Sequence, residues 1–342
     1  MRVIRCDSSH QEQWNAFVHA CPRASFYHRW EWRDINQRCF GHQTEYLAAV
    51  DGDRFVGVFP LVRLKTLLFG TIGCSMPFVN YGGPCGDSDD IERALLAEAA
   101  RVADQWGVAY LEIRSKRRLG GEYPCSEHKV SMTVALDGDT EGLWNALKVG
   151  TRKEVRRASN KGFTVRQGPQ LLDDFYAVLS ESWRELGTPI YAPDYLRTVL
   201  SSFADSTRLT MVYAADGRPA AGALDGLHGG IVEGMWLGMR PEFRQQLVGY
   251  VLYWELIKDA SDRGFQLYHL GRSSKDSGGE QFKKKWNADS VPLYWQYILR
   301  TRRDVPSLNP AHPRYGLAIK AWQKLPLGIT QFLGPFIARG IP

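Results

Sequence analysis

The 342-residue chain is predicted to fold as a duplicated α/β protein, with helices covering a mixed sheet in each of two domains. Three observations predict this class. The chain is longer than one hydrophobic core usually supports. Its apolar content of 44% and charged content of 23% are ordinary for a globular protein. The same order of helices and strands also occurs twice along the chain.

In the first half, apolar spacing predicts two helices, three strands, a long helix and two further strands. Trp14, Phe17 and Val18 share one face of the first helix. The second helix is expected over 29–38 and the three strands over 46–50, 55–64 and 68–79, followed by a helix over 90–106 and strands over 108–113 and 129–136.

The second half repeats this order after a turn at 137–139. We expect a cation-rich helix over 141–161, amphipathic helices over 171–186 and 195–203, strands over 209–214, 220–227 and 231–237, a long helix over 242–263, and strands over 265–270 and 292–299. The predicted domains are therefore 1–138, 139–299 with the active centre, and a basic C-terminal extension over 300–342. Two unrelated α+β domains are the alternative interpretation.

Composition argues against several classes of protein. The six cysteines form no CxxC pair, which favours buried reduced thiols, and the eight histidines show no metal-binding spacing, so no metal is expected. The chain has no apolar run long enough to span a bilayer and no signal peptide, which indicates a cytoplasmic protein.

The C-terminal extension is basic, although the rest of the chain is balanced in charge. Residues 300–342 hold seven Lys or Arg and only one acidic residue, Asp304. Cations beside Trp322 and the apolar stretch LPLGITQFLGPFI are typical of a surface that meets an anionic membrane, which would place the protein at the periphery of the inner membrane. We prefer the alternative, in which the extension wraps over the body and is buried by its apolar residues.

The stretch 264–287, GFQLYHLGRSSKDSGGEQFKKKWN, is the first candidate for the reacting end of the molecule. It reads as a strand that breaks into a glycine-rich loop and closes on Phe282, a run of three lysines and Trp286. Cations beside aromatic side chains at the end of a buried strand are suited to an anionic substrate.

The order of elements resembles the acetyltransferase (GNAT) fold. At residue level the chain resembles the FemA/FemB/FemX family of peptidoglycan-bridge aminoacyltransferases, which duplicate that fold, and in particular FemAB-like proteins associated with exosortase/PEP-CTERM systems. The matching stretches are FGHQTEYLAAV, GVFPLVRLKTLLFG, MPFVNYGGP, RELGTPI, GRSSKDSGGEQFKKKWN and VPLYWQY. The helical arm of the bridge-forming enzymes is not visible here.

This resemblance implies catalytic roles for three residues. Lys283 matches the lysine of the family's FK motif and would stabilise the charge on the reacting carbonyl, with Phe282 shaping the pocket. Glu233, in the middle of a strand, is the candidate general base, although alternation could equally point it to water, which we slightly favour. A solvated charge run is the alternative for the lysines, and we expect Lys284 and Lys285 to face solvent.

Four further residues are candidate substrate contacts. Arg272 ends a strand, where its guanidinium could hold a phosphate or carboxylate. Arg152 and Arg156 are four residues apart on the cation-rich helix, a spacing that an anion would relieve. Tyr81 lies in an Asn-Tyr-Gly-Gly-Pro turn of the first domain, the domain that helps to bind the acceptor in the resembled family.

The expected function is acyl or aminoacyl transfer to an amine of a cell-envelope, polysaccharide or peptidoglycan precursor, lipid- or nucleotide-linked. The donor is acyl-CoA or aminoacyl-tRNA, which would make tRNA a partner. Only Gly249 remains of a glycine-rich cofactor turn in Arg244–Gly249. The alternatives are a catalytically inactive scaffold in exopolysaccharide export, or RNA binding by the basic helix.

Overall fold

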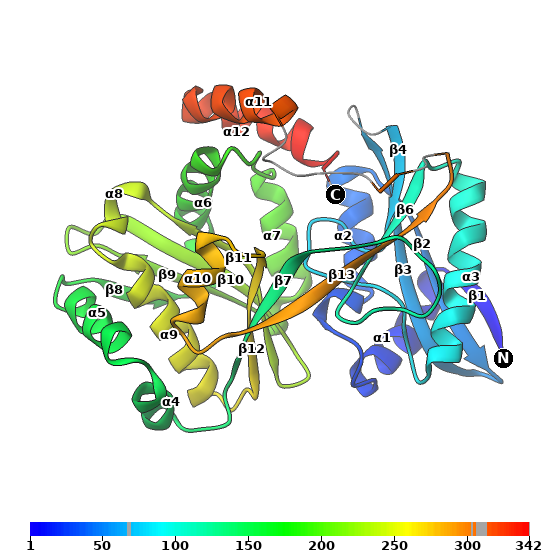
Figure 1. Cartoon of the computed structure of the whole chain (residues 1–342), viewed down its shortest axis with the longest axis horizontal. Helices are drawn as coiled ribbons and strands as arrows, with labels where there is room; N and C mark the ends of the chain where they lie inside the picture. The colour runs from blue at the N-terminus through cyan, green and yellow to red at the C-terminus, as the bar shows by residue number, and fades with distance from the viewer. Residues whose placement is uncertain (67–69, 302–303, 306–312, 342) are drawn as a thin grey trace. The chain divides into compact units, whose positions relative to one another are not determined.

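The computed structural model of the chain describes residues 1–66, 70–301, 304–305 and 313–341. Two compact units emerge. Unit 1 contains Met1–Val130, the segment that begins at Val291, and the end of the chain from Arg339. Unit 2 contains Ser131–Ser290 and the C-terminal helices (Figure 1).

The sheet of unit 1 has the strand order β1-β2-β3-β4-β6-β13, with β5 paired to β3. Its strands are antiparallel except for β4 and β6, which run parallel. Their bounds are β1 (Arg2–Cys6), β2 (Gln43–Asp51), β3 (Arg54–Thr66), β4 (Gly70–Cys74), β5 (Cys85–Gly86), β6 (Tyr110–Ser115) and β13 (Asp289–Leu299).

Alternation along β2 divides the core of unit 1 into two layers, because successive side chains point to opposite faces of a strand. Leu47 and Ala49 join the cluster beneath α3 (Asp89–Trp106). Tyr46, Ala48 and Val50 join the cluster on the other face, which includes residues of α1 (Gln11–Ala20). Helix α2 (Glu31–Phe40) contacts β2.

Helix α3 shows why the sequence prediction succeeded for the long helices. The Ser88 side chain accepts from the Ile91 amide, three acidic residues occupy the first turn, and Gly107 ends the helix at φ +59. The predicted range, 90–106, differs from the observed one by one residue.

In unit 2 the strand order is β7-β12-β11-β10-β9-β8. The meander β9-β10-β11 is antiparallel, as expected, and β11 and β12 run parallel. The bounds are β7 (Cys125–Ala135, entering unit 2 at Ser131), β8 (Thr164–Gln167), β9 (Thr207–Tyr213), β10 (Pro219–His228), β11 (Ile231–Met239) and β12 (Leu267–Ser274).

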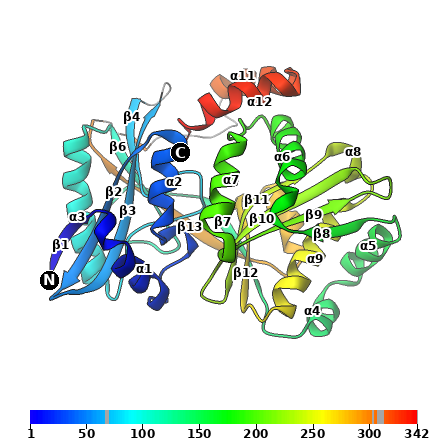
Figure 2. The ribbon, with the colours of Figure 1, turned by 180° about the vertical axis from the view of Figure 1, so that it is seen from behind.

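Helices cover both faces of this sheet. Helix α6 (Leu172–Leu186) contacts β10 and β11, and α7 (Pro193–Ser202) lies beside it (Figure 2). On the other face α9 (Val248–Asp262) contacts β9 and β10, and α5 (Val149–Ser159) and α4 (Thr140–Ala146) contact α9 (Figure 1).

Two predicted helices are each broken into two. The helix expected over 141–161 is α4 and α5, because Leu147 and Lys148 between them are extended. The helix expected over 242–263 is α8 (Pro241–Arg244) and α9, separated by a turn that ends at Leu247. The strand expected over 68–79 is β4, ending at Cys74; its expected residues 68 and 69 lie outside the described residues. Strands β1, β5 and β8 were not predicted.

The units also differ from the expected domains 1–138 and 139–299. Strand β13 was placed in the second domain, but it belongs to unit 1 because Tyr294–Leu299 pair with β6. The extension 300–342 is not a separate part either, since α11 (Pro313–Lys324) and α12 (Leu327–Ala338) belong to unit 2 and contact α6.

Candidate active site

The parallel ladder of β11 and β12 ends inside unit 2, before either strand does. Three residue pairs form it, from Ile231–Leu267 to Glu233–His269, while β11 continues to Met239 and β12 to Ser274. The register of β10 with β11 shifts immediately afterwards, so that Met235 is an extra residue on β11. A bulge bends its strand and increases the twist, and bulges are common beside active sites. The candidate catalytic residues gather around this ladder end.

The last pair of the ladder consists of two ionisable side chains. Glu233 and His269 are both buried, and Glu233 Oε2 lies 3.1 Å from His269 Nδ1. The preference for a water-facing Glu233 was therefore wrong. Helices cover both faces of the sheet, and β10 and β12 flank β11, so neither face of this strand is at the surface. His269 was missed, because a lone histidine in an apolar strand gives no sequence signal.

Lys283 extends a buried ammonium group to the backbone of β12. It lies in α10 (Gly278–Lys284), whose first turn is capped by the Ser277 hydroxyl. Its Nζ donates to the carbonyls of Gly271 and Arg272, each at 3.1 Å. An ammonium has three N–H donors, so one of them remains for a ligand after the two bonds found within the described structure.

Burial decides the protonation of this lysine. Desolvation, assisted by the charge of Arg272, lowers the pKa of Lys283 to about 7. Lys283 is only 9% exposed, whereas Lys284 and Lys285 are exposed, as expected from the sequence. The strand was expected to break into a glycine-rich loop after residue 270; instead β12 runs on to Ser274 and Gly278 begins a helix.

Phe282 belongs to an aromatic cluster between α9 and α10. Its ring lies 5.3 Å from Tyr250 and 5.2 Å from Tyr253, and Trp286 stacks on Tyr253 at 5.9 Å. Aromatic packing of this kind excludes water from one side of α10 and fixes the helix on α9. Low local polarity in turn strengthens any charge interaction that Lys283 makes.

Arg272 is half-buried on β12, and its carbonyl accepts from Lys283. The structure therefore brings together Lys283, Phe282 and Arg272. Glu233 is one strand away, with its partner His269 two residues before Gly271 on β12.

The turn before α9 holds a strained residue. Leu247 has φ +67, the left-handed conformation that normally favours glycine. Gly249 in the first turn of α9 has little spare room, since a Cβ there would lie 3.0 Å from Met239 Sδ and 3.5 Å from the Phe282 ring. The turn before α9 therefore has a left-handed backbone at position 247, although this residue is a leucine.

Arg152 and Arg156 lie on α5 of the same unit. Arg152 is half-buried with one long hydrogen bond, 3.5 Å, to Asn145, and Arg156 is exposed with its guanidinium 5.3 Å from the centre of the Trp144 ring. The neighbouring Thr151 hydroxyl donates to the Lys285 carbonyl at 3.3 Å. The first turn of α5 thus lies at the C-terminal end of α10, but no described contact joins either arginine to Lys283.

Tyr81 belongs to unit 1 and is almost fully buried, at 1% exposed. Its ring meets Tyr27 edge-on at 5.3 Å, and the Lys116 ammonium lies 4.9 Å from its centre. A ligand would reach this ring only after a rearrangement, so the structure supports the alternative of a packed turn over direct contact.

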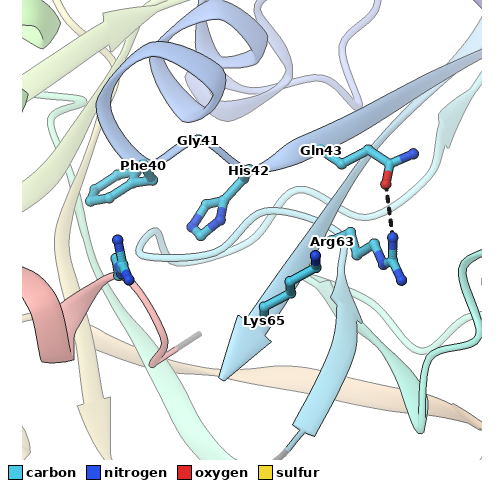
Figure 3. A pocket seen from close by; sticks show the side chains of 7 residues that line it. Phe40, Gly41, His42, Gln43, Arg63 and Lys65 are labelled. Carbon is cyan, nitrogen blue, oxygen red and sulfur yellow. Dashed lines mark hydrogen bonds between the residues drawn. The ribbon is translucent and has the colours of Figure 1, made fainter. Parts of the chain in front are cut away.

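Unit 1 also contains a cation-lined pocket of about 300 Å³ that the sequence did not reveal (Figure 3). Its charged residues are Arg63, Lys65 and Arg339, and Gln43 accepts from Arg63 at 3.1 Å. No ion pair to an acidic residue is found for the three cations in the described part of the chain. Burial lowers the pKa of His42, on the same wall, to about 4, so this ring is neutral at pH 7.

Comparisons with known proteins agree with this architecture. Residues 149–284 match the family model "Acetyltransferase (GNAT) domain". The matched residues lie within unit 2, from the start of α5 to the end of α10. This family supports an acyltransferase in general, with acyl-CoA as the donor used by GNAT domains. No curated protein sequence matches significantly.

Solved structures show the same fold over nearly the whole chain. FemX matches with 16% identity and a TM-score of 0.64, over 88% of this chain and 98% of FemX. The C-terminal domain of a putative lysylphosphatidylglycerol synthetase from Agrobacterium fabrum matches with 12% identity and a TM-score of 0.57, over 92% and 95%. A tandem GNAT protein from the clavulanic acid biosynthesis pathway matches with 12% identity and a TM-score of 0.52, over 89% and 99%. The predicted tandem GNAT-like fold is confirmed.

Within the described residues, no group of three or more His, Cys, Asp or Glu is arranged to hold a metal ion. Among the helices that the structure describes, none is both long and apolar enough to cross a bilayer.

Proposed function

We propose that this protein transfers an acyl or aminoacyl group to an amine, with the reaction at the ladder end of β11 and β12. The observation that carries the proposal is the buried Lys283 ammonium, held on the carbonyls of Gly271 and Arg272 inside a GNAT domain. A buried cation with a spare donor is costly to maintain for packing alone.

The reaction requires one bond to form and one to break. The amine nitrogen of the acceptor attacks the carbonyl carbon of the donor, and the new C–N bond replaces the C–S bond of a thioester or the C–O bond of an ester. The amine proton passes to a base, and the leaving sulfur or oxygen takes up a proton. Negative charge develops on the carbonyl oxygen during the attack.

Lys283 is suited to that developing charge. Its remaining N–H can donate to the oxygen, and the Phe282 cluster keeps the surroundings poorly polar, where such a bond is worth most. Glu233 with His269 is the candidate base, since a carboxylate that orients an imidazole is a common arrangement for accepting a proton.

The acceptor is proposed to be a cytoplasmic precursor of the cell envelope or of a polysaccharide, lipid- or nucleotide-linked. Two of the structural neighbours carry the names FemX and lysylphosphatidylglycerol synthetase, which fits an acceptor of this class. Membership of the FemAB-like group associated with exosortase systems is part of the same proposal.

Phosphate-bearing acceptors would suit two cationic surfaces. In unit 1, the pocket of Arg63, Lys65 and Arg339 offers three charges around a space large enough for a phosphate group. In unit 2, Arg272 and the arginines of α5 are the candidate contacts, and tRNA remains a candidate partner there if the donor is aminoacyl-tRNA.

A transfer assay tests the proposal directly. Purified protein is supplied with acetyl-CoA, longer acyl-CoAs or aminoacyl-tRNA, together with amine acceptors, and amide product is measured by mass spectrometry. With the productive donor, we expect Lys283→Ala to lower kcat by about 100- to 1000-fold, as loss of one donor to a developing oxyanion usually does.

Lys284→Ala is the matched control, because Lys284 is the exposed neighbour, whose ammonium pairs at 2.8 Å with the buried Glu280 and, within the described residues, makes no hydrogen bond to β12. Its kcat should stay within about twofold of the parent. Equal turnover of Lys283→Ala and the parent would overturn the role of Lys283. Absence of product with every donor would favour the inactive scaffold.

A further inference from the structure

Helix α12 buries small residues and exposes large apolar ones, the reverse of the usual pattern for a helix at a protein surface. Its buried residues are the small ones, Thr330, Gly334 and Ala338, each four positions after the last. Gly334 approaches so closely that a Cβ there would lie 2.8 Å from the Ile190 carbonyl oxygen. Small residues therefore attach α12 to unit 2, and the preferred expectation that its apolar side chains would be buried was wrong.

The large apolar side chains of α12 point into solvent. They recur at i, i+3, i+4, i+7 and i+8, the spacing of one continuous helix face. This outer face consists of Ile329, Phe332, Leu333, Phe336 and Ile337. Phe332 is 71% exposed and Phe336 59% exposed, and the two rings contact each other at 5.9 Å. Exposed apolar patches of this kind mark interaction sites.

The charged residues of the C-terminal segment have one sign. From residue 305 onward the chain carries four Lys or Arg and no Asp or Glu. Lys320 and Lys324 are exposed on α11 beside the exposed Leu317, and the exposed Arg339 directly follows α12. An apolar helix face with flanking cations has the chemistry of a helix that lies in the headgroup region of an anionic bilayer.

The length of α12 limits how it could bind. Twelve residues rise about 18 Å, whereas a bilayer core is about 30 Å thick, so this helix can lie on a membrane but cannot cross it. A second copy of this chain is a weaker candidate, because a two-fold contact would bring the same cationic surroundings against each other.

We propose that the outer face of α12 docks this protein on an anionic lipid surface, with the apolar side chains among the acyl chains and Lys320, Lys324 and Arg339 among the phosphates. Docking of this kind is separate from the transfer chemistry proposed above, because it uses no residue at the ladder end of β11 and β12, and it shares only Arg339 with the proposed acceptor pocket of unit 1.

Vesicle flotation of the full chain tests the proposal. We expect the parent protein to float with vesicles that contain phosphatidylglycerol and to bind vesicles of phosphatidylcholine alone more weakly. The double variant Phe332→Glu/Phe336→Glu should lower the partition coefficient by about tenfold or more, since it places charge on the inserted face. Lys320→Glu/Lys324→Glu should remove the preference for phosphatidylglycerol.

Control variants distinguish insertion of the outer face of α12 from nonspecific adsorption to vesicles. Val149→Glu adds a charge at another exposed apolar side chain of unit 2, 72% exposed, and should bind like the parent. Lys283→Ala should also bind like the parent, so loss of turnover and loss of docking are distinguishable. Circular dichroism and thermal unfolding establish that each variant is folded.

Two outcomes would overturn the proposal. One is that the folded parent does not float with either kind of vesicle. The other is that Phe332→Glu/Phe336→Glu floats like the parent, or changes only the mass of a dimer in light scattering, which would assign the outer face of α12 to a second copy of the chain.

Discussion

The two units contain the same parallel ladder with different chemistry at its end. In unit 1 the last pair of the β4–β6 ladder is Cys74 and Glu112; in unit 2 the last pair of the β11–β12 ladder is Glu233 and His269. An arginine follows two residues later in β6, and three residues later in β12. Arg114 is fully buried, whereas Arg272 is half-buried.

In unit 1 the protein's own groups occupy the ladder end. Arg114 Nε donates to Glu112 at 2.7 Å, its Nη1 donates to the Val79 carbonyl at 3.2 Å, and its guanidinium lies 4.3 Å from the centre of the Trp295 ring. The returning backbone closes the space, since the Gly82 amide donates to the Arg114 carbonyl at 3.1 Å.

In unit 2 a lysine side chain takes the place of that backbone. The carbonyl of Arg272 accepts from Lys283 rather than from a returning amide. At its ladder end unit 1 thus pairs an arginine with its own carboxylate and backbone carbonyl, whereas unit 2 uses a lysine that titrates and has a donor to spare. This difference predicts that unit 1 is structural here and that the single active centre is in unit 2.

Replacing the arginine near each ladder end, Arg114 or Arg272, should give the largest difference between the two units. Arg114→Ala leaves the buried Glu112 charge without its guanidinium, which we expect to lower the free energy of unfolding by about 3–5 kcal/mol. Arg272→Ala, half-exposed, should cost less than about 1 kcal/mol. Urea unfolding followed by fluorescence measures both; similar losses for the two variants would contradict the comparison.

The ladder-end pair should separate the units by activity. Glu233→Gln keeps the size of the side chain but removes its basicity, so kcat should fall by about 100-fold if this pair accepts the proton. Cys74→Ser, at the corresponding pair of unit 1, should leave kcat of the folded protein within about twofold. A folded Glu233→Gln protein with parental kcat would exclude Glu233 from proton transfer.

Titration of Lys283 should be visible in the stability of the whole protein. Its pKa is about 7 in the folded state and near 10.5 when unfolded. Between these values the unfolded chain binds more protons, so the stability contributed by this group rises with pH, by about 2 kcal/mol from pH 7 to pH 9. It is flat below about pH 6, where both states are protonated.

Lys283→Met keeps the length of the side chain and cannot titrate. Urea unfolding at pH 7, 8 and 9 should show this rise in the parent and a smaller one in the variant. The same slope in both proteins would mean that the folded-state pKa of Lys283 is not lowered.

Sequence periodicity predicted most elements because it reports which faces of a segment are buried. It could not predict partners: the apolar pattern of β13 is the same whether the strand pairs within its own unit or, as observed, with β6. The same limit explains Glu233, since alternation loses its meaning where helices bury both faces of a sheet.

Apolar periodicity did not identify the residues of the site, which required other information. Lys283 was singled out by its resemblance to a family motif, because a run of three lysines does not reveal which one is buried. The pocket of Arg63, Lys65 and Arg339 joins residues far apart in the sequence, and no local pattern connects them. The break before α9 was missed because Leu247 does not signal a left-handed residue.

Leu247 gives the prediction with the smallest expected effect on how the two units differ. Each has one non-glycine residue at positive φ soon after its meander, Phe78 in unit 1 and Leu247 in unit 2. Phe78 is nearly buried and its ring lies 4.6 Å from Phe40, so packing holds its strained backbone. Leu247 is only half-buried.

We expect Leu247→Gly to change the free energy of unfolding by no more than about 1 kcal/mol, because relief of strain offsets lost burial and the flexibility of glycine. Leu247→Ala, which keeps the strain, should be less stable than Leu247→Gly by about 1 kcal/mol. If the alanine variant were the more stable of the two in urea unfolding, the turn before α9 would not be held in the left-handed conformation, and its backbone would be free to adapt to a donor.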